Sequence, residues 1–181
     1  MLRLRPHLMT ACVALALTGC ANYAVPRYAV NIDNVDALRQ IQAQPVNIGP
    51  FSGAEGGRVE MTCRGNGVVK TTDGETFAAY VRKALTDELK LAQAYNAASP
   101  VTLTGELKQL NFDSLKGVWA LTLSLKSSNG WSVDVQSGFE YQTSFVLETA
   151  CTQTAQAFVP AVQNLIRHVV HNPDFIKLVS R

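Results

Sequence analysis

Residues 101–145 alternate between apolar and polar side chains over most of their length. Three runs share this pattern: "VTLTGELKQL", "WALTLSL" and the stretch from Trp131 to Phe145. Because the side chains of a strand point alternately to the two faces of a sheet, a period of two predicts strands with one buried and one solvated face. Asn129-Gly130, between the last two runs, suits a type I′ hairpin turn. We therefore expect a three-strand antiparallel meander that is covered on one side.

Two helices are predicted to cover the apolar face of that sheet. The first begins at a capping box formed by Thr72 and Glu75. Its apolar stripe, at three- and four-residue spacing, consists of Phe77, Val81, Ala84, Leu85 and Ala92. The second runs from about Thr152 to His171, and Pro160 lies either in its first turn or at a kink in a longer helix. Its stripe consists of Phe158, Val162, Leu165, Ile166 and Val169.

Shorter strands are expected before the first helix. Val46 and Ile48 alternate in one of them, and Val59, Met61 and Cys63 alternate in the next, which ends at the turn sequence "RGNG". The order is therefore strands, helix, three strands, helix. It predicts the fold class α+β: an antiparallel sheet with a three-strand meander and two main helices packed on one face.

The first twenty residues, "MLRLRPHLMTACVALALTGC", are typical of a secretory signal. Arg3 and Arg5 provide a positive start, and the apolar run after them has about ten residues. A membrane-spanning helix needs roughly 20. The last four letters, "LTGC", resemble the lipobox of bacterial lipoproteins. In that family the cysteine thiol receives a diacylglyceryl group, cleavage occurs before the cysteine, and the new amine is acylated. The resemblance implies that Cys20 is the lipidated first residue of the mature protein.

A competing interpretation is ordinary cleavage at the small-x-small sequence Ala14-Leu15-Ala16. The number of cysteines argues against it. Ordinary cleavage leaves Cys20, Cys63 and Cys151, an odd set with one free thiol in an oxidising compartment. Lipidation uses Cys20 and leaves an even pair, for which we expect a disulfide between Cys63 and Cys151; the alternative is two separate buried thiols.

These features divide the chain into three parts: a signal peptide at 1–19, a lipidated N-terminus and tether at 20–44, and a single α+β domain at 45–181. Several acyl chains hold a protein stably to a membrane. Residue 21 is alanine, whereas aspartate at this position retains enterobacterial lipoproteins in the inner membrane. By this resemblance we expect the periplasmic face of the outer membrane.

Charge and motifs exclude several function classes. Without its signal the chain has 14 basic and 14 acidic residues, and it lacks the clustered basic surplus of a nucleic-acid binder. His168 and His171 are three residues apart on the second helix, but two ligands fall short of a closed zinc site. No phosphate-loop, nucleophile-elbow or C-x-x-C motif occurs. We therefore expect no catalytic residues, no metal and no cofactor.

Several segments of the mature chain resemble a family of uncharacterised proteobacterial outer-membrane lipoproteins. They are "NVDALR", "VNIGPFSG", "FAAYVRKALTDELKLA", "VTLTGEL" and "HNPDF". More distantly, the layout is similar to auxiliary lipoproteins of ABC-type transporters and to the lipopolysaccharide-assembly lipoprotein. The resemblance implies a fold and a location and transfers no catalytic residues. The cysteine pair and the "GGRVEMTCRGNG" segment depart from the family pattern.

The favoured function is a non-enzymatic, lipid-anchored docking or auxiliary module for an envelope protein or transport complex. Strands around Val46 and Val101 are expected to offer edges to which a partner strand could add. The alternative is a small periplasmic hydrolase or ligand-binding protein whose site is assembled from scattered residues.

The lipobox generates the first testable prediction. Cys20→Ala removes the acceptor thiol, so the protein is expected to appear in the soluble periplasmic fraction or to stall as the unprocessed precursor. Fractionation of cells and the intact mass of the mature protein measure this. Membrane association with an unchanged mature mass in the variant contradicts lipidation at Cys20.

Overall fold

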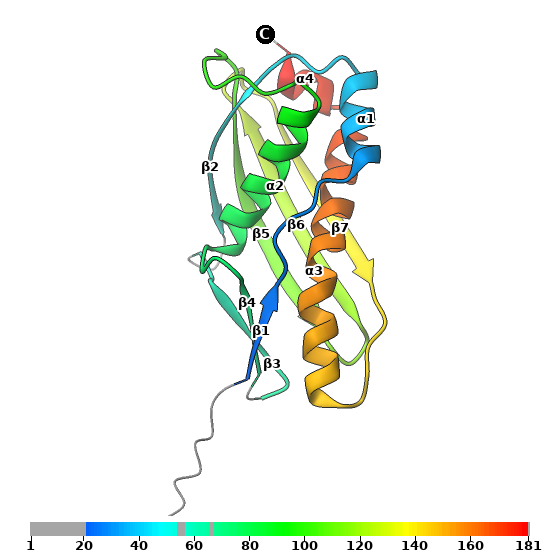
Figure 1. Cartoon of the computed structure of the whole chain (residues 1–181). Helices are drawn as coiled ribbons and strands as arrows, with labels where there is room; N and C mark the ends of the chain where they lie inside the picture. The colour runs from blue at the N-terminus through cyan, green and yellow to red at the C-terminus, as the bar shows by residue number, and fades with distance from the viewer. Residues whose placement is uncertain (1–20, 54–56, 66, 181) are drawn as a thin grey trace, which may run out of the picture.

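The computed structural model in Figure 1 describes residues 21–53, 57–65 and 67–180. Its larger sheet has the strand order β2-β5-β6-β7, and a smaller one has the order β1-β4-β3. The strands are β1 (Asn22–Val25), β2 (Asn47–Gly53), β3 (Glu60–Cys63), β4 (Gly67–Thr71), β5 (Thr102–Asp113), β6 (Val118–Ser127) and β7 (Ser132–Glu140). The helices are α1 (Ile32–Gln40), α2 (Phe77–Leu91), α3 (Leu147–Val170) and α4 (Phe175–Val179).

The predicted meander is present as β5-β6-β7, with both pairings antiparallel. Leu107, Leu123 and Val135 lie side by side across its three strands, all on the buried face. The turn between β6 and β7 is not type I′, because only Gly130 has a positive φ and its N–H donates to Ser127. This is the longer hairpin loop in which a left-handed residue follows a type I turn.

The sequence predicted an antiparallel sheet, but the sheets of the structure are mixed. β2 pairs with β5 in parallel, and β1 pairs with β4 in parallel in the second sheet. Parallel neighbours require a long crossover connection, and here β3, β4 and α2 lie between β2 and β5 in the chain. Alternation of side chains fixes which face of a strand is buried but says nothing about the direction of its neighbour, which explains the error.

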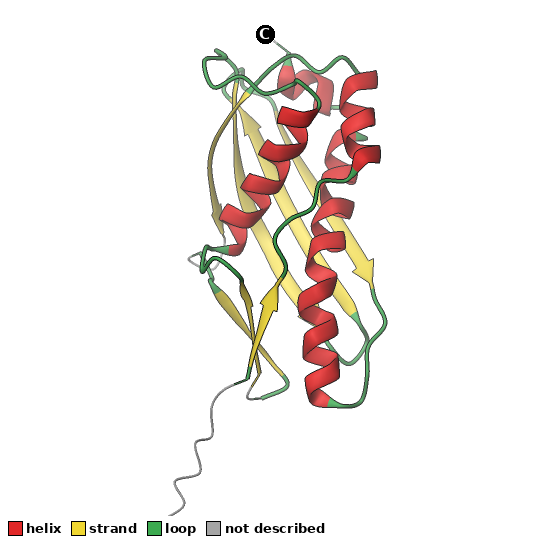
Figure 2. Cartoon of the chain, viewed as in Figure 1, coloured by secondary structure: helices red, strands yellow, loops and turns green. Residues whose placement is uncertain are grey.

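Helices α2 and α3 lie on the same face of the larger sheet (Figure 2). Their predicted apolar stripes are buried, and Trp119 of β6 donates its Nε1–H to the carbonyl of Thr154 in α3. α3 begins five residues earlier than predicted, so Pro160 lies inside the longer helix, one of the two alternatives. Within the described part of the chain, no helix has the length and apolar character needed to cross a membrane.

The start of α2 differs from the predicted capping box. Its N-cap is Thr76, whose hydroxyl accepts from the N–H of Ala79 at 3.1 Å. Thr72 instead donates to the carbonyl of Val25, and Glu75 forms an ion pair with Lys83. The predicted pair therefore stabilises contacts around the helix start rather than capping it.

The segment expected to be a tether is, from Asn22 onward, part of the folded body. β1 adds to the smaller sheet, and Val25 of β1 and Val35 of α1 are fully buried in the common core. Only a few apolar side chains make this attachment, and they are separated by polar and proline residues. The composition of the segment therefore resembles that of a linker although the segment is packed.

A buried carboxyl group holds α1 in place. Glu88 of α2 is fully buried, and its Oε1 accepts from the Tyr28 hydroxyl, the Asn31 N–H and the Asn34 side-chain amide. The Asn34 amide also donates to the carbonyl of Gln163 in α3 at 3.0 Å. Burial raises the pKa of Glu88 despite these three donors, because a desolvated carboxylate loses its hydration. Glu88 thus joins α1 and its preceding loop to α2, and Asn34 joins them to α3.

This arrangement predicts a pH-dependent stability. Because the folded-state pKa of Glu88 lies above its unfolded value, its contribution is complete below the unfolded pKa and is lost as the pH rises through the folded one. Glu88→Gln stays neutral and keeps an acceptor oxygen, so the fall in unfolding free energy as the pH rises above the unfolded pKa of the carboxyl is expected to flatten. Glu88→Ala leaves buried donors unpaired and is expected to cost about 2 kcal/mol or more.

Urea denaturation across this pH range measures both effects, and Asp87→Asn on the exposed side of the same helix is the matched control. Parallel stability curves for the wild type and Glu88→Gln contradict the assignment.

Candidate functional site

The residues singled out in the sequence lie in separate places. Cys20 lies outside the described residues, so its lipidation stays a prediction. Cys63 and Cys151, the pair expected to be bonded, form a disulfide that joins the end of β3 to the first turns of α3. His168 and His171 each bond a backbone carbonyl through Nδ1, those of Gln136 and Arg167 respectively. No cluster of three or more potential metal ligands occurs among the described residues.

The strand edges expected around Val46 and Val101 are already occupied. The N–H of Val46 donates to Ala94, and its carbonyl accepts from Asn96. The carbonyl of Val101 accepts from Asn47. Edge addition at these two positions would require displacing these bonds.

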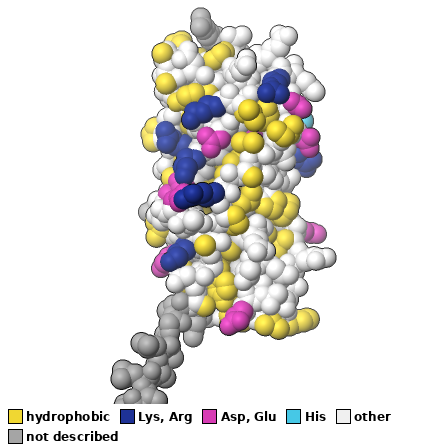
Figure 3. Space-filling model, in the orientation of Figure 1, with side chains coloured by type: hydrophobic (Ala, Val, Ile, Leu, Met, Phe, Trp, Pro, Cys, Tyr) yellow, Lys and Arg dark blue, Asp and Glu magenta, His cyan; other side chains and the backbone are white. Residues whose placement is uncertain are grey.

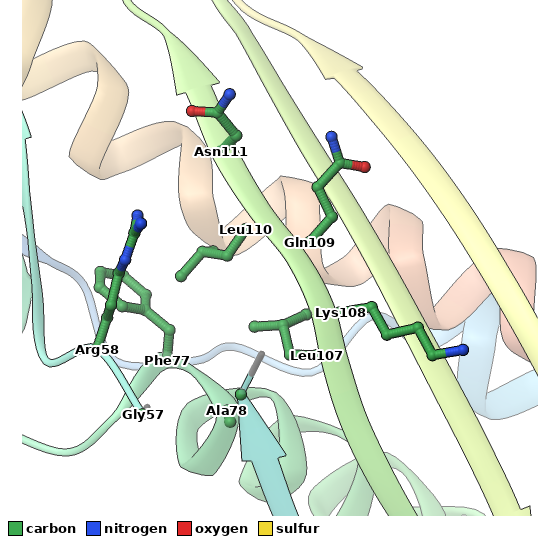
Figure 4. Close-up of a pocket in the computed structure, with 10 residues that line it drawn as sticks. Gly57, Arg58, Phe77, Ala78, Leu107, Lys108, Gln109, Leu110 and Asn111 are labelled. Atoms are coloured by element: carbon green, nitrogen blue, oxygen red, sulfur yellow. The ribbon is translucent and has the colours of Figure 1, made fainter. Parts of the chain in front are cut away.

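A cleft of about 300 Å³ lies between the start of α2 and the second half of β5. Figure 4 shows Phe77, Ala78 and Leu107 directed toward its interior, with Leu110 beside them and Arg58 and Asn111 at its rim. Lys108 points away and pairs with Asp134 on the opposite face of the sheet. The cleft therefore has an apolar floor and a polar rim.

A β-bulge in β5 builds this floor. The pairing register with β6 shifts between Leu107 and Gln109, so Lys108 and Gln109 both bond on the far face of the sheet. The shift returns Leu110 and Phe112 to the side of the helices. One sequence signal marks the bulge: the apolar positions change parity between Leu107 and Leu110.

The cleft continues into a hollow of about 380 Å³ along β3. The two share Arg58 and Asn111, and Glu60, Met61, Thr62 and Phe112 line the extension. We call the combined depression the inter-sheet groove. It runs between the exposed strand β3 of the smaller sheet and the second half of β5.

Both strands that border the groove have an edge without a partner strand among the described residues. β3 pairs only with β4, and the pairing of β5 with β2 ends at Gly53 and Leu107. Beyond that point, the Phe112 N–H donates to the side chain of Asn111 at 2.9 Å. A local side chain thus satisfies a donor of the type that a neighbouring strand would accept.

The groove supplies the groups that an extended peptide needs. Two strand edges offer backbone donors and acceptors, and the apolar floor can receive alternate side chains. Arg58 and Glu60 place one charge of each sign at the rim. Sequence reasoning missed this site because it depends on where β2 stops pairing with β5, which no local pattern reports.

Comparisons with known proteins give only weak likenesses among solved structures. The chain matches no protein-family model and no curated protein. Among solved structures it is similar to a protein from Caulobacter crescentus CB15 that is provisionally described as a lipoprotein. The TM-score is 0.39 and the identity 13%, over 80% of this chain and 93% of that one. A TM-score of this size carries no argument, so the resemblance to transporter-auxiliary and lipopolysaccharide-assembly lipoproteins stays a prediction.

The disulfide generates a stability prediction, because it closes a separation of 88 residues and fixes one border of the groove. On the chain-entropy account, a loop of this length contributes up to about 4–5 kcal/mol. The double variant Cys63→Ser, Cys151→Ser is therefore expected to unfold at a lower urea concentration. Non-reducing peptide mapping checks the bond directly, and two freely alkylatable thiols in the native wild type contradict it.

Proposed function

We propose that this protein is a non-enzymatic lipoprotein, anchored to the periplasmic face of the outer membrane through Cys20, whose body docks an extended segment of an envelope protein. The observation that carries the proposal is the pair of unpaired strand edges that face the inter-sheet groove. Edge addition uses main-chain hydrogen bonds for affinity and side-chain pockets for specificity. The groove combines both, whereas Val46 and Val101, around which the sequence predicted open edges, carry the backbone bonds described above.

The groove also indicates what the docked segment is like. Its floor of Phe77, Leu107 and Leu110 accepts apolar side chains that alternate with polar ones, as in a strand. Its rim carries Arg58 and Glu60, and the mature chain has no net formal charge. A segment of mixed charge with alternating apolar residues fits better than a strongly acidic or basic one.

A second candidate is a small-ligand site in the deeper part of the groove. The cleft of about 300 Å³ lies at the lower end of the range for small-molecule pockets. Its apolar floor favours a ligand with a short hydrocarbon part. This candidate corresponds to the alternative predicted from the sequence, a small periplasmic hydrolase or ligand-binding protein.

Site-specific crosslinking in living cells tests docking. A photoreactive amino acid in place of Glu60 is expected to capture one defined envelope protein, through an extended segment identified by mass spectrometry. The same amino acid in place of Glu140, which is exposed at the end of β7, is the control position. Lysine on strand edges opposes strand addition, so Thr62→Lys with Asn111→Lys is expected to abolish capture.

The matched variant Gln136→Lys changes an exposed position of β7 and is expected to retain capture with an unchanged melting temperature. Equal capture in both Lys variants, or from both crosslinking positions, contradicts docking in the groove. Saturable binding of an apolar small molecule in the absence of any captured protein favours the second candidate.

A further inference from the structure

One end of the molecule carries a group of large apolar side chains that are open to solvent. They lie in the β5–β6 turn and at the start of α3, and we call them the apolar tip: Leu115, Phe145, Val146 and Leu147. Phe145 is 100% exposed, Leu115 70% and Val146 62%. Single exposed apolar residues are common on soluble proteins, but several such residues gathered together indicate an interaction surface.

The tip is held in place by specific bonds. Arg64, in the β3–β4 turn, donates to the carbonyl of Phe145 at 3.0 Å and to that of Ser114 at 2.7 Å. Thr143 also donates its hydroxyl to the Ser114 carbonyl. These bonds join the two loops of the tip to each other and to the smaller sheet. The exposure of Phe145 is therefore part of a defined arrangement.

The chain enters the fold at this same end. The carbonyl of Ala21 accepts from Val68 of β4, close to the turn that contains Arg64. Figure 1 shows the start of β1, the β3–β4 turn and the start of α3 together at the lower end, opposite α4. Figure 3 shows hydrophobic side chains gathered at that end of the surface, beside an acidic one.

We propose that the apolar tip inserts into the interfacial region of the lipid bilayer, with Phe145 and Leu115 as its deepest side chains. The inference rests on the proposed lipidation of Cys20. Successive Cα atoms are 3.8 Å apart, so Asn22, the first residue of β1, lies within roughly 8 Å of the anchored cysteine. Because no flexible segment separates Cys20 from β1, the lipid on Cys20 holds the end of the body that carries Ala21 against the headgroups. The apolar tip lies at that same end.

The charges around the tip favour insertion through apolar contact. Lys116 is exposed beside Leu115, but it lies 3.8 Å from Asp113, and Glu148 follows Leu147 on α3. Together with Arg64, which bonds both loops of the tip, these groups give two positive and two negative charges. Insertion is expected to occur in zwitterionic vesicles and to depend little on salt, because no excess of cations recruits anionic lipids.

The experiment uses the mature chain from Cys20 onward, coupled through the Cys20 thiol to a maleimide lipid in phosphatidylcholine vesicles. The disulfide between Cys63 and Cys151 leaves Cys20 as the thiol that reacts. In Phe145→Trp the added indole is expected to show a blue-shifted emission and to lose most of its intensity when the lipids carry bromine near the headgroup. Ile176→Trp places an exposed indole on α4 at the opposite end, and its emission is expected to stay unchanged.

Emission of Phe145→Trp that is the same on vesicles as in solution overturns the proposal. A second result would also overturn it: the Cys20→Ser body dimerises with rising concentration, Phe145→Asp abolishes the dimer, and bromolipid quenching is absent. In that case a second copy of the chain covers the tip. Chemical coupling keeps the two hypotheses separate. Absence of the lipid on Cys20 in cells defeats the proposed anchor, whereas absence of quenching on coupled vesicles defeats only the inserted tip.

Discussion

Phe158 of α3 is buried where the two long helices meet the sheet, and its ring contacts three others. Trp119 of β6 lies 4.8 Å away between ring centroids, Phe77 of α2 5.1 Å and Tyr80 of α2 5.2 Å. Aromatic pairs of this kind add to the free energy of burial and fix the relative orientation of the elements. Phe77 also forms the floor of the groove, and Tyr80 donates to the carbonyl of Pro26 in the N-terminal segment. The groove and the N-terminal segment therefore both depend on the aromatic cluster around Phe158.

Much of the sheet and both long helices could be predicted, because their buried faces repeat along the sequence with a period of 2 or 3.6. The pairing of Cys63 with Cys151 could be inferred once the signal peptide and the lipobox accounted for the other two cysteines. The parallel pairing of β2 with β5 could not be predicted, because the alternation of Val46 and Ile48 suits a parallel strand and an antiparallel strand equally well. The N-terminal segment was misjudged because Val25 and Val35 are too far apart to form a periodic pattern. Both errors concern contacts between distant parts of the chain.

The groove was beyond prediction for a related reason. Leu110 is directed toward the helices because of a bulge, and among the described residues the pairing of β2 with β5 stops at Gly53. The first cause leaves a trace in the sequence as a change of parity, while the second depends on the length of a neighbouring strand. The groove borders the half of β5 that leads into the turn at Leu115, so a segment docked there would lie near the end where the chain enters the fold.

The C-terminal helix α4 is fixed at the end of the molecule opposite the start of β1. The side-chain amide of Asn129, in the β6–β7 turn, donates to the carbonyls of Lys177 and Ser180 and holds α4 against the sheet. α3 runs between the two ends of the body, and its 24 residues at 1.5 Å each span roughly 36 Å. α3 therefore sets the distance between the end where the chain enters and the end that carries α4, and a fluorescent reporter fused after α4 would lie at about this distance from Ala21.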